Sequence, residues 1–105
     1  MKFTKIIKST KKIKSELTDI DLDTIQEIVN NIIAESDLSI EIDRRDDSLD
    51  ILISLDGLGD NYESVYNEFE DLLVEIKIKV LQKFRSKVQF NPIWGDSTGM
   101  SIRSR

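Results

Sequence analysis

Residues 95–99 are the part of this sequence whose residue types and spacing most resemble an active site. Gly95, Ser97 and Gly99 fit the G-x-S-x-G pattern that surrounds the nucleophile of many serine hydrolases. Such a serine lies between a strand and a helix and needs a base, but the chain contains no histidine. A lysine base, Lys83 or Lys87, would have to be desolvated, and both lie among other cations. We therefore interpret the pentapeptide as a turn and expect neither catalytic residues nor enzyme activity.

Two further patterns resemble ligand sites without completing them. Asp19, Asp21 and Asp23 have the D-x-D-x-D opening of a calcium loop, but the glycine and the glutamate that complete the loop are missing. Gly57 and Gly59 lie between a predicted strand and a predicted helix, as in a dinucleotide-binding turn, but the third glycine is replaced by a tyrosine. Without cysteine or histidine, only oxygen ligands remain for a metal. We expect no metal site and no cofactor.

Length and composition predict one soluble globular domain over residues 1–105. The chain has 39% apolar and 33% charged residues, which places it outside the disordered class. No apolar run approaches the roughly 18 residues that span a bilayer. Lysines interrupt every apolar pair near the N-terminus, which argues against a secretory signal. These features predict a cytoplasmic protein without a membrane span, and no small-molecule substrate is evident.

The net charge of −5 conceals three segments of opposite sign. Residues 1–15 carry six lysines and no acid, residues 16–75 carry nineteen acids against two arginines, and residues 76–105 carry seven bases against one acid. Because a surface without partners usually intersperses the two signs, this segregation indicates a partner or self-complementarity. The basic patch that we predict at the two ends comprises Lys2, Lys5, Lys8, Lys11, Lys12, Lys14, Arg103 and Arg105.

The N-terminal segment, residues 1–17, is predicted to be a basic amphipathic helix. Its apolar residues, such as Phe3, Ile6 and Ile13, fall on one side of a helical projection and its lysines on the other. Such a helix could follow the phosphates of a nucleic acid, lie on an anionic membrane surface or dock on an acidic protein. It could equally pack on its own domain with its lysines in water.

The remaining elements follow from the period of the apolar residues. We expect a helix over residues 24–35 with a Thr24–Glu27 capping box, a β-hairpin over 38–55, and a long helix over 61–85 that begins after Asp60 or Asn61. Residues 86–105 read as an extended C-terminal tail that can add a short terminal strand. The predicted fold is α+β in the order α-α-β-β-α, with the antiparallel hairpin packed on the long helix.

The long helix also carries a second apolar stripe on a face turned away from its main one. A helix on the outside of a small domain needs only one apolar face, so the C-terminal segment or another chain must cover the second. A tryptophan nearby favours an interface, since tryptophan is enriched among interface hot spots. The predicted partner interface is Val74, Ile78, Leu81 and Trp94.

These features predict a non-enzymatic protein-interaction or assembly subunit that acts as an oligomer or as part of a larger complex. The alternative is a nucleic-acid-associated accessory protein that binds phosphates through the basic termini. The acidic centre could also mimic a nucleic-acid backbone and inhibit a protein with a basic cleft. Salt-dependent binding to a duplex would distinguish the nucleic-acid alternative from the others.

Overall fold

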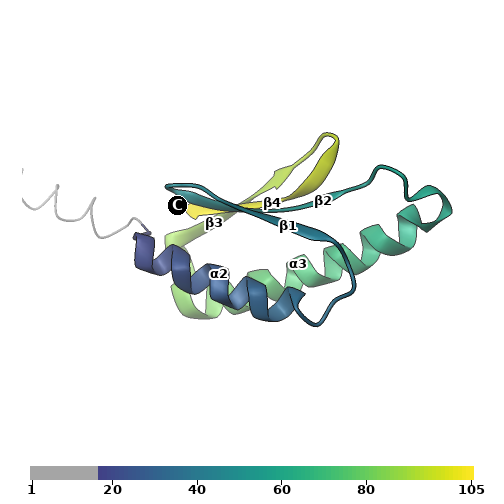
Figure 1. Ribbon diagram of the computed structural model, residues 1–105. Coiled ribbons are helices and arrows are strands. Elements are labelled where there is room, and N and C mark those ends of the chain that lie inside the picture. The colour runs from purple at the N-terminus through teal and green to yellow at the C-terminus, as the bar shows by residue number, and fades with distance from the viewer. Residues whose placement is uncertain (1–16) are drawn as a thin grey trace, which may run out of the picture.

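The computed structural model describes residues 17–105, which form a two-layer α+β domain (Figure 1). Two helices, α2 (Asp19–Ile33) and α3 (Tyr62–Phe84), lie against one face of a four-stranded sheet. The strands are β1 (Ile40–Arg44), β2 (Ser48–Ser54), β3 (Val88–Ile93) and β4 (Ser97–Ser104). Short 3-10 turns, Gly59–Asn61 and Arg85–Lys87, flank α3 at its two ends. The α+β class predicted from the sequence is confirmed.

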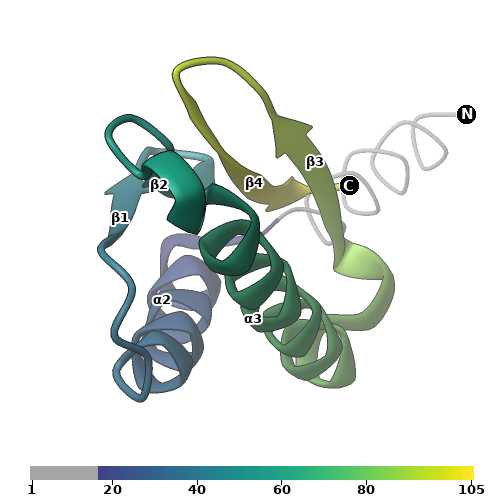
Figure 2. The same cartoon turned by 90° about the vertical axis from the view of Figure 1, so that its right-hand side faces the viewer.

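The sheet consists of two antiparallel hairpins that α3 connects. Strands β1 and β2 form the first hairpin, β3 and β4 form the second, and β2 pairs with β4, which gives the order β1-β2-β4-β3. Figure 2 shows both helices beneath the sheet, with α3 running back from the end of β2 to the start of β3. The second hairpin therefore lies beside α3, and this arrangement positions the candidate site.

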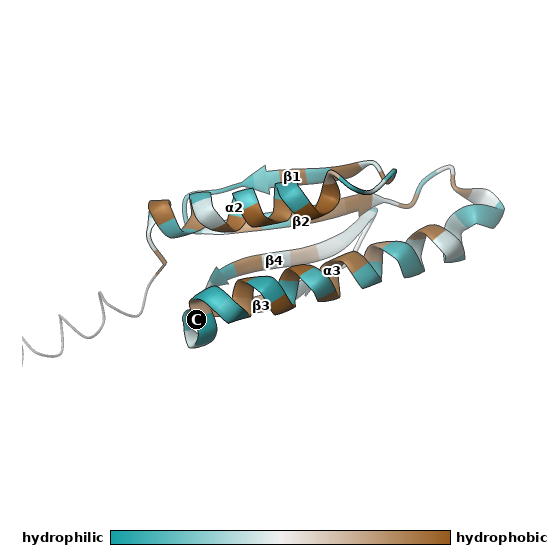
Figure 3. Ribbon diagram, turned by 90° about the horizontal axis from the view of Figure 1, so that it is seen from below, coloured by the Kyte–Doolittle hydropathy of each residue, from teal (hydrophilic) through white to brown (hydrophobic). Residues whose placement is uncertain are grey.

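The core lies between the helices and the sheet. Alternation along β2 directs Leu49, Ile51 and Ile53 toward the helices, and Met100 and Ile102 of β4 join them. Apolar and polar segments alternate along both helices in Figure 3, as expected for elements with one buried face. The helical core residues are Leu22, Ile25, Val29 and Ile32 of α2 and Phe69, Leu73, Ile76, Val80 and Phe84 of α3. This core is complete without the second stripe of α3.

Helix α2 begins at Asp19, five residues before the predicted start. The capping box is formed by Thr18 and Asp21, because the Asp21 N–H donates to Thr18 Oγ1 at 3.1 Å and the Thr18 N–H donates to the Asp21 carboxylate at 3.0 Å. Thr24 lies inside the helix, where its hydroxyl donates to the Ile20 carbonyl. The prediction of a Thr24 box after an acidic connector was therefore wrong. The acidic residues instead occupy the first turn, where the helix dipole favours negative charge.

The C-terminal segment is a second hairpin and not an extended tail. Strand β4 pairs with β2 on one side and with β3 on the other, so it is a central strand. Strand β3 lies at the edge, where Pro92 can be accommodated although it has no N–H to donate. The predicted short terminal strand was thus an underestimate of a segment that supplies half of the sheet.

Helix α3 agrees closely with the predicted range 61–85. Asn61 occupies the N-cap position, although its side chain makes no capping hydrogen bond. The helix ends at Arg85, whose φ of 50° lies in the left-handed region and turns the chain toward β3.

The predicted basic N-terminal helix, apart from Leu17, lies outside the described residues. The Leu17 N–H donates to the Ser104 hydroxyl at 2.7 Å and thereby joins the start of the described chain to the end of β4. No helix within residues 17–105 has the length and apolar character needed to cross a membrane.

Candidate interaction surface

The G-x-S-x-G pentapeptide is part of the β3–β4 hairpin. Gly95 and Asp96 form the turn, and Ser97 begins β4, which continues as a strand to Ser104. A serine nucleophile elbow requires a helix after the serine, whereas here the next residues pair with β2 and β3. The pattern is therefore explained by the needs of a hairpin: Gly95 has a φ of 148°, and Gly99 lies where β4 approaches β2 most closely.

The three aspartates with calcium-loop spacing lie in a helix and not in a loop. Asp21 belongs to the capping box, and the Asp23 carboxylate forms an ion pair with Arg44 of β1 at 2.6 Å. Arg44 also donates to the Gln26 side chain at 3.2 Å, so these residues attach α2 to the edge of the sheet. Within residues 17–105, no group of three acidic side chains is placed so that it could hold a metal ion.

The second apolar stripe of α3 is exposed. Val74, Ile78 and Leu81 retain 50%, 52% and 42% of their accessible surface, whereas Ile76 and Val80 on the opposite face are fully buried. The C-terminal segment does not cover the stripe, because it forms β3 and β4 within the sheet. We refer to Val74, Ile78 and Leu81 as the α3 stripe. The sequence left two candidates for covering the stripe, the C-terminal segment and another chain, and the C-terminal segment is thus excluded.

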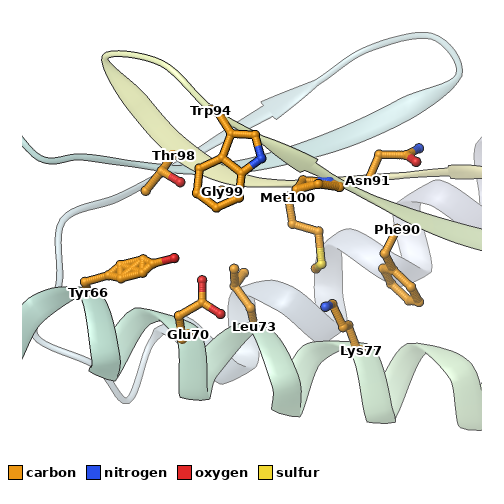
Figure 4. A pocket seen from close by; sticks show the side chains of 11 residues that line it. Tyr66, Glu70, Leu73, Lys77, Phe90, Asn91, Trp94, Thr98, Gly99 and Met100 are labelled. Atoms are coloured by element: carbon orange, nitrogen blue, oxygen red, sulfur yellow. The ribbon is translucent and has the colours of Figure 1, made fainter.

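Trp94 lies on the second hairpin, beside α3 but not on the stripe. Its side chain is 71% exposed and overhangs a pocket of about 250 Å³ between the hairpin and α3 (Figure 4). Helix α3 contributes Tyr66, Glu70, Leu73 and Lys77 to the pocket, and the hairpin contributes Phe90, Trp94 and neighbouring residues. No residue of the α3 stripe lines this pocket, which we call the hairpin pocket.

The charge in the hairpin pocket is balanced. Glu70 and Lys77 both point from α3 toward the strands (Figure 4). Desolvation raises the pKa of Tyr66 above its ordinary value of 10.0, and a hydrogen bond with Glu70 and the negative charge of Glu70 raise it further. The Tyr66 ring is stacked on Tyr62, with 6.2 Å between the ring centroids. The pocket therefore presents aromatic surface with one acid and one base, which suits contact with a protein side chain better than bond-breaking chemistry.

Tyr66, which lines the hairpin pocket, and its stacking partner Tyr62 were not recognised as a site in the sequence. Tyr62 and Tyr66 share the helical spacing of the core residues, and this spacing predicts burial. The first turns of α3 extend beyond the sheet, however, so Tyr62 remains 48% exposed (Figure 1). The spacing identified the helix correctly but was wrong about the burial of Tyr62, because the length of the sheet could not be inferred from it.

The described part of the basic patch lies at the end of β4 and just after it. Arg103 is exposed on β4, on the sheet face opposite the helices, and Arg105 is at the exposed end of the chain. The six lysines, Lys2 to Lys14, lie outside the described residues. Arg45 forms ion pairs with Asp43 and Asp50, each at 3.3 Å.

No protein-family model matches this sequence, and no curated protein shows significant similarity to it. The surface of the domain, and above all the exposed apolar residues of α3, therefore provides the basis for a function.

Proposed function

We propose that this chain is a non-enzymatic interaction or assembly subunit that works in the cytoplasm as an oligomer or as part of a larger complex. One observation carries the proposal: three apolar side chains in register on α3 stay half-exposed although the domain has a complete core without them. Single exposed apolar residues are ordinary on a protein surface, but a continuous apolar stripe on a helix is typical of a contact surface.

Trp94 and the hairpin pocket support the same proposal. A tryptophan that is 71% exposed leaves a large aromatic surface in water, and tryptophan is among the residues that contribute most to protein interfaces. The pocket beneath it has the size to receive one or two side chains from a partner. The α3 stripe lies on the helix that also lines the hairpin pocket, and the β3–β4 hairpin lies beside this helix. A single partner could therefore contact both.

The energetics favour a contact of moderate strength. Covering the exposed half of a Val, Ile or Leu side chain stabilises a complex by about 1 kcal/mol for each residue. Three such residues and a tryptophan provide enough to offset part of the entropy lost on association, but not enough for a very tight complex. We therefore expect an assembly that depends on protein concentration.

Ile78→Lys tests the proposal directly. The substitution places a charge in the middle of the α3 stripe, where Ile78 is 52% exposed, so it is expected to disrupt assembly and to leave the fold intact. Light scattering across a range of concentrations should give the mass of an oligomer for the wild type and that of a single chain for Ile78→Lys. Circular dichroism should show the same secondary structure for both.

Ile20→Lys is the matched control, because Ile20 is another isoleucine on a helix and is 75% exposed, but it lies on α2. This variant should assemble like the wild type. A wild type that is monomeric at every concentration, and that also elutes as a single chain from extracts of its source cells, would contradict the proposal.

The two alternative functions, phosphate binding to a nucleic acid and mimicry of a nucleic acid, receive no specific support from the described residues. Phosphate binding through the predicted basic patch depends mainly on the six lysines from Lys2 to Lys14, which lie outside the described residues. Mimicry of a nucleic acid relies on unpaired acids, and three of the acids, Asp23, Asp43 and Asp50, are paired with arginines.

A further inference from the structure

The charges that flank the α3 stripe identify what kind of surface would fit it. Val74, Ile78 and Leu81 are separated by four and then three residues, which is the spacing of a helix seam that packs on another helix. Asp71 lies three residues before Val74, and Arg85, the C-cap residue whose N–H donates to the Leu81 carbonyl, lies four residues after Leu81. The same spacing therefore reaches an acid within α3 at one end and a base at the helix end at the other. Both side chains are exposed, and neither forms an ion pair with another described residue.

The pattern is symmetric about Ile78. Asp71 precedes Ile78 by seven residues and Arg85 follows it by seven, which corresponds to about 10 Å along the helix in each direction. A two-fold axis through Ile78 would therefore bring Asp71 of one chain opposite Arg85 of an antiparallel second chain, and the reverse. A parallel arrangement would place Asp71 against Asp71 and Arg85 against Arg85, which repel one another.

We propose that the α3 stripe is a self-complementary surface on which a second copy of this chain packs, with its α3 antiparallel to the first. The inference rests on the proposed function and specifies its partner. Two-fold pairing of one patch with itself is the commonest geometry of soluble oligomers.

The direction of the helix dipoles agrees with this arrangement. The acids of α3 precede its bases: Glu63, Glu68, Glu70, Asp71 and Glu75 come before Lys77, Lys79 and Lys83, and Arg85 is the C-cap residue that follows. A two-fold axis at Ile78 overlaps residues 72–84 of the two helices and opposes their dipoles, with Asp71 beside Arg85 at each end of the overlap. Glu63, Glu68 and Glu70 lie beyond the overlap. Lys77, which would otherwise approach its own copy near the axis, points toward the strands of its own chain in Figure 4.

A charge-reversal cycle tests the proposal. Asp71→Arg and Arg85→Asp are each expected to weaken self-association at least about tenfold, because each places like charges together at two points of the dimer. The double variant restores opposite charges in reversed order, so its dissociation constant should return to within about threefold of the wild type. The measurement is sedimentation equilibrium, with circular dichroism to verify that each variant is folded. Glu68→Lys is the control, because it reverses an acid of α3 that lies off the stripe, and it should have little effect.

The possible results separate this inference from the proposed function. Self-association that Ile78→Lys abolishes, but that neither charge reversal weakens, would overturn the antiparallel arrangement and leave the proposal of an interaction subunit intact. A wild type that never self-associates, while Ile78→Lys releases it from a larger complex, would overturn the second copy as the partner. Weakening by each reversal together with recovery in the double variant is the result that we expect.

Discussion

Gly99→Ala is expected to abolish stable folding. A Cβ atom at this position would lie 1.8 Å from the Ile51 carbonyl oxygen and 3.0 Å from the Leu52 Cα, and both of these atoms belong to the backbone of β2. Strands β2 and β4 are the central pair of the sheet, so they would have to separate where the core residues Ile51 and Met100 face each other. Overpacking typically costs about 1–3 kcal/mol, and because the added atom here meets backbone that cannot rotate away, the reduction in the free energy of unfolding should lie at or above the upper end of that range. Thermal and urea denaturation followed by circular dichroism would measure the loss.

Gly57→Ala is the matched control for Gly99→Ala. Gly57 has a φ of 75°, but a Cβ atom there would meet no other atom within 4 Å. The substitution should therefore cost only the strain of the left-handed conformation, about 1 kcal/mol. Equal losses of stability in the two variants would show that the close approach of β4 to β2 is not as described.

Ile76→Ala is expected to have the second-largest effect on stability. Ile76 is fully buried in the core, and removing a buried isoleucine side chain to its Cβ atom leaves a cavity that costs roughly 2–5 kcal/mol. Ile78→Ala removes the same atoms two residues later on the same helix, where half of the side chain is exposed. It should reduce the free energy of unfolding by less than about 1 kcal/mol.

Urea denaturation at a low protein concentration, where the chain is monomeric, would compare the two alanine variants without a contribution from assembly. At a high concentration, Ile78→Ala should lose some additional stability relative to the wild type, because the stripe then contributes to an interface. If Ile78→Ala destabilised the dilute protein as much as Ile76→Ala, the α3 stripe would be part of the core.

The elements with strong periodicity could be predicted from the sequence, and those fixed by contacts between distant residues could not. Helix α3 and the β1–β2 hairpin have long and regular apolar patterns, which determine both their type and their approximate limits. The start of α2 was wrong because two Thr-containing capping boxes, at Thr18 and at Thr24, are compatible with the sequence. The length of strand β4 was underestimated because Gly99 interrupts its apolar pattern. The role of Gly99 depends on pairing with β2, which is distant in the sequence.

The candidate site, too, has features that could be predicted from local periodicity and features that depend on contacts between distant residues. The second apolar stripe, Val74, Ile78 and Leu81, follows from helix geometry, but its exposure could not be predicted, because the C-terminal segment was an equally good candidate to cover it. The hairpin pocket around Trp94 could not be predicted, because it requires the second hairpin to lie beside α3. The symmetry of Asp71 and Arg85 about Ile78 is present in the sequence, but it acquires a meaning only once the stripe between them is known to be exposed.

The most direct test of this account is disulfide crosslinking, because the chain contains no cysteine and each variant then carries a single one. A two-fold axis at Ile78 should bring two Ile78→Cys side chains within the Cα separation of about 4.4–6.8 Å that a disulfide needs. Lys83→Cys is the control, since Lys83 is exposed on the same helix but away from the stripe. Under mild oxidation, Ile78→Cys should convert almost completely to a covalent dimer and Lys83→Cys should remain monomeric. No dimer from Ile78→Cys, or equal amounts from both variants, would contradict the claim that the outer face of α3 is where two copies of this protein meet.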